Sequence, residues 1–124
     1  MEMDDAVAHN TLTLMIMSGV EDGRTLTYAA EDGDGISTGE AWTLTIGRQE
    51  TRNIVLQRDT FISREHAELT LRDGQWWLEG CGSKNGAFIE NGDEEKRVTE
   101  PVVIQPGQLF RIGRTWLRIQ DDEA

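Results

Sequence analysis

The chain of 124 residues has few of the features that mark exported or membrane-spanning proteins. Its single cysteine, Cys81, cannot form an internal disulfide, so nothing in the sequence indicates an oxidising compartment. No apolar run approaches the roughly 20 residues that a membrane-spanning helix needs. The first residues are acidic, whereas a secretory signal begins with basic residues. We therefore expect a cytoplasmic protein without direct membrane insertion.

Basic residues are also scarce. Twelve lysines and arginines stand against 23 acidic residues, for a formal net charge of -11. Because like charges repel over about a Debye length, we expect no general binding to nucleic acid or anionic lipid. The deficit is uneven, since residues 1–40 hold nine acidic side chains and one basic one, while residues 47–90 hold six basic and seven acidic ones. The middle of the chain can therefore carry a local anion site.

The sequence lacks a capped segment of useful length with helical periodicity. Instead, apolar and polar residues alternate over short stretches, which is the pattern of half-buried strands. Turn signals separate these stretches, among them Asp73-Gly74, Asn91-Gly92 and Pro106-Gly107. We expect an all-β fold, a two-sheet β-sandwich of many short, mostly antiparallel strands, because a second sheet covers the apolar faces. The expected strands are 11–17, 23–28, 42–46, 54–56, 67–72, 76–78, 87–89, 102–104, 109–112 and 115–119.

The length fits one domain with a single core. We expect a flexible acidic N-terminus at residues 1–10, a sandwich domain at 11–120 and an acidic tail at 121–124. Residues 29–41 are polar, acidic and rich in glycine, so we expect a loop there. This loop begins with Asp32-x-Asp34, as calcium loops do, but Ile36 and Thr43 stand where oxygen ligands are needed. We therefore expect neither a metal site nor a cofactor.

Hydrogen-bond donors gather in three turns between the expected strands. The first turn contains Gly47-Arg48, the second runs from Phe61 to Ala67, and the third is Ser83-Lys84-Asn85-Gly86. Guanidinium, ammonium, hydroxyl and amide groups together suit an oxyanion, and phosphate is the most common biological candidate. The three turns therefore predict an anion-binding site displayed by a rigid β-scaffold.

The order and spacing of these clusters resemble a known family. Gly47-Arg48, then Ser63-x-x-His66, then Asn85-Gly86 is similar to the motif of the forkhead-associated (FHA) domain, a β-sandwich that recognises phosphothreonine peptides. Gly107-x-x-x-x-Ile112-Gly113 agrees with the same family. The resemblance runs from about Leu12 to Ile119, and it implies ligand loops at one end of the sandwich.

The resemblance also implies a role for each residue of the site. Arg48 matches the arginine that reaches the peptide main chain or the phosphate. Ser63 and Arg64 match positions that contact the phosphate directly, and Lys84 matches a further position that reaches it. Asn85 matches the residue whose amide bonds the peptide backbone just after the phosphothreonine. These five residues are the expected phosphopeptide-binding set.

Three further residues are expected to support the loops. His66 is similar to the family's structural histidine, which braces the loop from below, and Gly47 and Gly86 belong to the same motif. The chain departs from the common family pattern at Gly80-Cys81 and at Ala87, which concerns loop bracing more than the phosphate donors.

The resulting hypothesis is a non-catalytic module that recognises phosphothreonine in Ser/Thr-kinase signalling. Its partner would be a Thr-phosphorylated protein or peptide, such as a Ser/Thr kinase or a kinase substrate. One alternative is a scaffold of the same fold that binds through another face, with Trp77 and Trp116 as contacts and without phosphate. A second is a hydrolase with Ser63 as nucleophile and His66 as base, although no acidic residue in the pattern would orient the imidazole.

Overall fold

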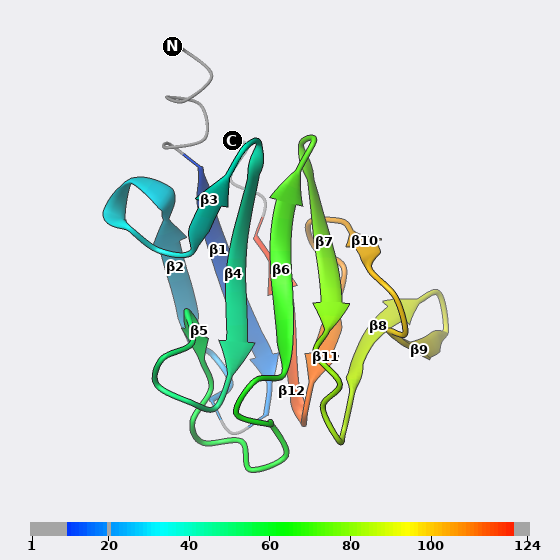
Figure 1. Cartoon of the computed structure of the whole chain (residues 1–124). Coiled ribbons are helices and arrows are strands. Elements are labelled where there is room, and N and C mark those ends of the chain that lie inside the picture. Colours follow the sequence, from blue (N-terminus) through cyan, green and yellow to red (C-terminus); the bar gives the residue numbers. More distant parts are fainter. Residues whose placement is uncertain (1–9, 20, 121–124) are drawn as a thin grey trace.

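The computed structural model describes residues 10–19 and 21–120, which form two β-sheets packed face to face (Figure 1). This arrangement confirms the predicted sandwich. All neighbouring strands are antiparallel except β4 and β5, which are parallel. The first sheet has the order β2-β1-β12-β11-β8-β9, and these strands are Thr25–Ala29, Thr11–Ser18, Thr115–Ile119, Phe110–Ile112, Ala87–Asn91 and Glu94–Arg97. The second has the order β10-β7-β6-β4-β3 with β5 beside β4, and these are Val102–Ile104, Gln75–Gly80, Ala67–Arg72, Ala41–Gly47, Ile36–Thr38 and Ile54–Val55.

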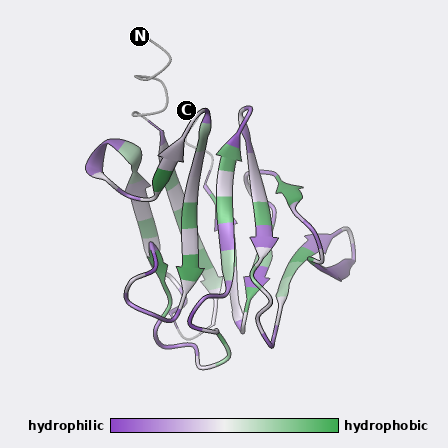
Figure 2. Ribbon diagram, in the orientation of Figure 1, coloured by the Kyte–Doolittle hydropathy of each residue, from purple (hydrophilic) through white to green (hydrophobic). Residues whose placement is uncertain are grey.

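The core consists of the apolar residues that alternate along the strands of both sheets. On β4, Trp42, Leu44 and Ile46 are fully buried, while Thr43 and Thr45 between them face outward. Trp42 packs against Trp76 of β7 with ring centroids 5.8 Å apart, so both tryptophans are core residues. Figure 2 shows the resulting alternation of hydrophobic and hydrophilic bands along the central strands. Burial of these side chains fixes the register of the sheets that carry the loops.

The turn between β6 and β7 has the predicted hairpin geometry. Asp73 and Gly74 have φ angles of 56° and 75°, and Arg72 pairs with Gln75 across the two-residue loop. Positive φ at both central positions is what a tight hairpin turn requires, because it matches the twist of the strands.

Two segments are more regular than the sequence indicates. Residues 29–41 were expected to form a loop, but they contain a 3-10 helix at Ala30–Asp32 and the edge strand β3. Asp34 orders this segment through two hydrogen bonds. Its side-chain carboxylate accepts one from Ala29 N (2.9 Å), and its backbone carbonyl accepts one from Trp42 Nε1 (2.7 Å). The charged segment after Asn91-Gly92 forms strand β9, which pairs with β8.

The first and last described residues lie at the same end of the sandwich. Strands β1 and β12 are antiparallel, and Gln120 N donates to Thr13 O (2.8 Å). Gly19, after β1, lies at the opposite end beside Thr115, where β12 begins. The predictions for a flexible N-terminus at 1–10 and an acidic tail at 121–124 concern segments that, apart from residue 10, lie outside the described residues. No helix in the described ranges is long and apolar enough to cross a membrane.

Candidate functional site

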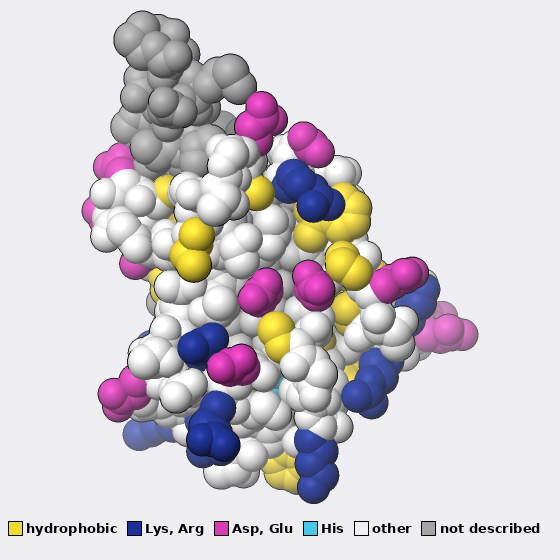
Figure 3. Space-filling model, in the orientation of Figure 1, with side chains coloured by type: hydrophobic (Ala, Val, Ile, Leu, Met, Phe, Trp, Pro, Cys, Tyr) yellow, Lys and Arg dark blue, Asp and Glu magenta, His cyan; other side chains and the backbone are white. Residues whose placement is uncertain are grey.

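The three donor-rich turns meet at the end of the sandwich that lies at the bottom of Figure 1. The first follows β4, the second joins β5 to β6, and the third joins β7 to β8. Strands β4, β6 and β7 are neighbours in one sheet, so the turns at their ends are brought together by strand pairing. In Figure 3, Lys and Arg side chains gather toward this end of the visible face, although the protein as a whole is acidic. The fold therefore places the predicted site residues in one region.

His66 joins the second and third turns from inside the protein. Its side chain is fully buried, Nδ1 accepts a hydrogen bond from Ser63 N (2.9 Å), and Nε2 lies 2.8 Å from Gly86 O. Because Nδ1 accepts, the ring proton of the neutral imidazole is on Nε2, which donates to Gly86 O. His66 thus connects the second and third turns through hydrogen bonds to their backbones.

The same geometry bears on the hydrolase alternative. Both ring nitrogens of His66 are bonded to backbone groups, so neither is available to take a proton from the Ser63 hydroxyl. Burial lowers the pKa of His66 below its ordinary value, with smaller opposing effects from Gly86 and Asp59. A general base needs a free nitrogen within hydrogen-bond reach of its proton donor. The Ser63 and His66 pair does not have the geometry of a nucleophile and base.

Gly47 and Arg48 connect the first turn to the second. Arg48 Nε donates to Ile62 O (2.9 Å), and Arg48 N donates to Ser63 O (3.0 Å). A Cβ atom at Gly47 would lie 2.0 Å from Arg64 O, a distance that no side chain can have. Glycine is therefore required at position 47 by the close approach of the two turns. Arg48 as a residue is exposed.

Asn85 connects the third turn to the second. Its Nδ2 donates to Phe61 O (2.8 Å), while Ser83 Oγ accepts a bond from Gly86 N (3.1 Å) within the third turn. Lys84 is exposed, and within the described residues it takes part in neither of the ion pairs. Hydrogen bonds therefore connect the turns that carry Arg48, Ser63 and Asn85. Lys84, on the third turn, is exposed.

A recess of about 370 Å³ opens between the first and second turns, and Gln49, Ser63, Arg64 and Glu65 line it. Ser63 and Arg64 are predicted site residues, whereas Gln49 and Glu65 were not identified from the sequence. Their only sequence signal is that they adjoin Arg48 and Arg64. Glu65 places a carboxylate beside the same opening, which opposes an anion there.

Asp59 is a further residue that sequence reasoning missed. It is buried, and its carboxylate accepts bonds from Phe61 N (2.9 Å), Arg114 N (2.7 Å) and Thr115 Oγ1 (2.7 Å). The bond to the backbone two residues ahead is an Asx turn, and an aspartate in the loop between two expected strands was the available signal. Asp59 ties the second turn to the opposite sheet, so it positions the loop without being exposed to a ligand.

The described residues contain no group of three or more His, Cys, Asp or Glu side chains that could hold a metal ion. The Asp34 carboxylate, part of the segment with a calcium-like start, is bonded to the backbone of Ala29.

Comparison with known proteins identifies relatives of this fold and sequence. A family model described as the FHA domain matches residues 44–113. Among curated proteins, the FHA domain-containing protein FhaB of Mycobacterium tuberculosis is 33% identical over 92 residues, which cover 70% of this chain and 56% of that protein. The chain thus spans little more than half the length of this relative.

Solved structures show the same architecture. A structure described as "Structural and functional analysis of phosphothreonine-dependent FHA domain interactions" superposes with a TM-score of 0.67 at 22% identity and covers 93% of this chain and 100% of that one. Mycobacterium tuberculosis EmbR, in complex with a low-affinity phosphopeptide, gives a TM-score of 0.66 at 21% identity over 89% of this chain and 24% of that one. At these identities the likeness shows the fold.

Proposed function

The chain belongs to the FHA domain family, and from this premise we propose that it is a non-catalytic module that binds threonine-phosphorylated proteins. The observation that carries the proposal is the meeting of three turns, held together by His66, Arg48 and Asn85, at one end of the sandwich. The names of two similar structures support it, since one describes phosphothreonine-dependent FHA domain interactions and the other a bound phosphopeptide.

The proposed phosphate contacts are Ser63, Arg64, Arg48 and Lys84. A phosphothreonine carries about −1.5 to −2 charges at pH 7 and strong acceptor oxygens. Ser63 and Arg64 line the recess between the turns and supply a hydroxyl and a guanidinium to those oxygens. Arg48 and Lys84 are exposed cations on the adjoining turns. Charge-assisted bonds are about twice as strong as neutral ones, so this set favours phosphorylated over unmodified threonine.

The peptide backbone is the proposed partner of Asn85. An asparagine side chain carries two amide hydrogens and a carbonyl oxygen, and one of these hydrogens already serves Phe61 O. The bond orients the amide and leaves further capacity for the main chain of a ligand. A preorganised amide beside the phosphate contacts fixes the direction in which the peptide lies. Signalling by Ser/Thr kinases is the context in which such a module serves, with a kinase or its substrate as partner.

The test is binding of matched peptides with and without phosphate on one threonine, measured by fluorescence anisotropy or calorimetry. We expect the phosphorylated peptide to bind and the unmodified peptide not to bind. Arg48→Ala and Ser63→Ala should each weaken the phosphorylated peptide by roughly tenfold or more, because a hydrogen bond to a charged group is lost. Arg72→Ala is a matched control, since Arg72 lies at the far end of the sheet over Trp77. Equal binding of the two peptides would refute the proposal.

A second candidate function is partner capture through the outer face of the sheet that contains β7. Across this face the strand register aligns the uncharged side chains of Ile36, Thr43, Thr70, Trp77 and Val103. Ile36 is 64% exposed. Trp116 lies in the other sheet, so it cannot share one contact surface with Trp77 as the sequence hypothesis assumed. Partner binding that survives Arg48→Ala but is lost in Trp77→Ser would favour this function.

A further inference from the structure

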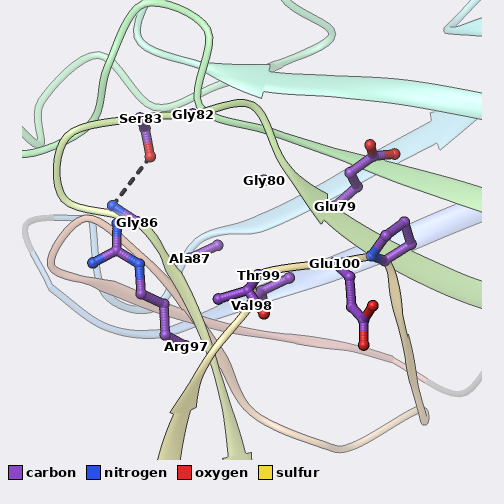
Figure 4. Close-up of a pocket in the computed structure, with 11 residues that line it drawn as sticks. Glu79, Gly80, Gly82, Ser83, Gly86, Ala87, Arg97, Val98, Thr99 and Glu100 are labelled. Atoms are coloured by element: carbon purple, nitrogen blue, oxygen red, sulfur yellow. Dashed lines mark hydrogen bonds between the residues drawn. The ribbon is translucent and has the colours of Figure 1, made fainter.

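A second recess lies directly behind the third turn. It has a volume of about 410 Å³ and is bounded by the end of β7, the third turn, the start of β8 and residues 97–101 (Figure 4). Its floor includes the buried side chains of Ala87 and Val98, its two walls carry Arg97 and the pair Glu79 and Glu100, and Ser83 lies at its edge. We name this space the rear recess.

Arg97 is held in a defined position in the rear recess. Its Cζ lies 5.7 Å from the centroid of the Phe88 ring, on the neighbouring strand. Its guanidinium also packs against Gly86, where an added Cβ would lie 2.9 Å from Arg97 Cζ. The absence of a side chain at Gly86 therefore allows this approach, in addition to the positive φ of 75° that the turn requires. Arg97 is an exposed residue, and its contacts with Phe88 and Gly86 orient the charged group.

Arg97 has no carboxylate partner among the described residues. The nearby Glu95 is paired with Arg111 of β11, on the other side of β8, and Glu21 is paired with Arg24. Arg97 therefore keeps its positive charge without a paired carboxylate in the described ranges, as do Arg48 and Arg64 of the proposed site, in a chain with a net charge of -11. Such a group, placed at the wall of a recess, is suited to a carboxylate on a partner, which an arginine binds with its two parallel N–H groups.

The rear recess adjoins the proposed phosphopeptide site. Ser83 and Gly86 line the recess and belong to the turn that carries Lys84 and Asn85. The hydroxyl oxygen of Ser83 accepts from Gly86 N, so its own hydrogen remains to donate to an acceptor. A peptide whose backbone is bonded to Asn85 therefore contacts the same turn that lines the recess with Arg97.

We propose that the rear recess is a second contact site for the same threonine-phosphorylated partner, and that Arg97 there selects an acidic side chain flanking the phosphothreonine. The inference rests on the proposed function and adds the sequence preference of the ligand. The opposite wall, with Glu79 and Glu100, repels a second acidic residue and accepts a basic or neutral one. The domain should therefore prefer one acidic residue at a particular spacing from the phosphothreonine. A uniformly acidic peptide segment would be repelled by the carboxylates of Glu79 and Glu100.

The experiment measures the affinity of a set of phosphothreonine peptides in which Asp replaces Ala at one flanking position at a time. Wild-type protein is expected to show one position at which Asp strengthens binding about three- to tenfold, the gain of one net charge-assisted contact. Arg97→Gln should remove this gain and leave the affinity for the Ala peptide within about twofold. Lys96→Gln is the matched control, because it removes the same charge from the adjacent residue, which does not line the recess. Circular dichroism and thermal unfolding verify that each variant is folded.

A charge reversal provides a second arm that does not depend on loss of binding. Arg97→Glu should invert the preference at the same position, so that Lys strengthens binding and Asp weakens it. Two results would overturn the inference and leave the proposed function intact. One is phosphate-dependent binding in which no flanking position favours Asp, and the other is a preference for Asp that is unchanged in Arg97→Gln. Equal binding of phosphorylated and unmodified peptides would overturn both.

Discussion

Replacement of His66 by alanine tests whether one buried ring holds the ligand loops together. The substitution removes the acceptor of Ser63 N and the donor to Gly86 O, both in a region closed to solvent. Each unsatisfied buried group costs about 1–3 kcal/mol, and the space left by the ring adds to this. We expect a loss of about 3–5 kcal/mol of unfolding free energy, a large share of the about 5–15 kcal/mol of a typical domain.

The pH dependence of the unfolding free energy provides a second, independent test of the role of His66. Burial lowers the pKa of His66 in the folded protein relative to the ordinary value, so below about pH 6.5 the unfolded chain binds more protons at this residue than the folded chain does. The stability contributed by the neutral ring is therefore complete above about pH 6.5 and declines as the pH falls toward the folded pKa. The slope is at most about 1.4 kcal/mol per pH unit.

Urea unfolding at pH 7.5 and pH 5.5 is the assay, applied to wild type, His66→Ala and His66→Gln. The glutamine variant keeps one acceptor and one donor, so it should lose less stability than alanine, and neither variant should show the histidine component of the pH slope. Phosphopeptide affinity measured at pH 7.5 should fall in His66→Ala because the second and third turns lose the link through the imidazole and keep only the bond from Asn85 to Phe61 O. A loss below about 1 kcal/mol, or an unchanged pH slope in both variants, would refute the bracing role.

Three further substitutions test the loop geometry. Asp59→Ala should lower the unfolding free energy by about 3–5 kcal/mol because three donors lose their acceptor; an unchanged urea midpoint would contradict this. Glu65→Gln should strengthen phosphopeptide binding about two- to fivefold at low salt, with a smaller gain in high salt, because a like charge leaves the recess; a weaker complex would show that Glu65 instead positions the turn. Gly47→Ala should cost about 3 kcal/mol or more, since the new Cβ meets Arg64 backbone atoms; near-normal unfolding would mean that the turn moves freely.

The sequence was most informative where local alternation and turn chemistry agree. Leu44, with threonines on both sides, indicated a half-buried strand, and Asp73-Gly74 indicated a tight hairpin. Both follow from interactions between residues close in the chain, so they can be predicted without knowing the fold. The resemblance in motif spacing then indicated that the loops of three strands share one end.

The missed features depend on contacts between distant residues. Strand β3 is exposed and only three residues long, and it forms because Ile36–Thr38 pairs with β4. Strand β9 is fully exposed and charged, so no apolar alternation marks it, and its order comes from pairing with β8. Asp59 bonds residues 55 and 56 positions away, a relation that the alternation pattern does not encode. Gln49 likewise joins the recess only because two turns fold against each other.

The position of Asn10 and Gln120 at the end of the sandwich opposite the loops determines how the domain can be tethered. Strand β4 alone has seven residues, and at about 3.3 Å per residue it spans about 23 Å. A phosphorylated segment attached beyond either of these residues must cross that distance, which takes on the order of seven or eight extended residues. Threonines closer than this to the domain are out of reach in cis and can occupy only the loops of another molecule. With a longer tether, a phosphorylated segment of the same molecule can reach the loops, and its effective concentration there lets it compete with a separate partner. Tether length therefore decides between self-binding and partner binding.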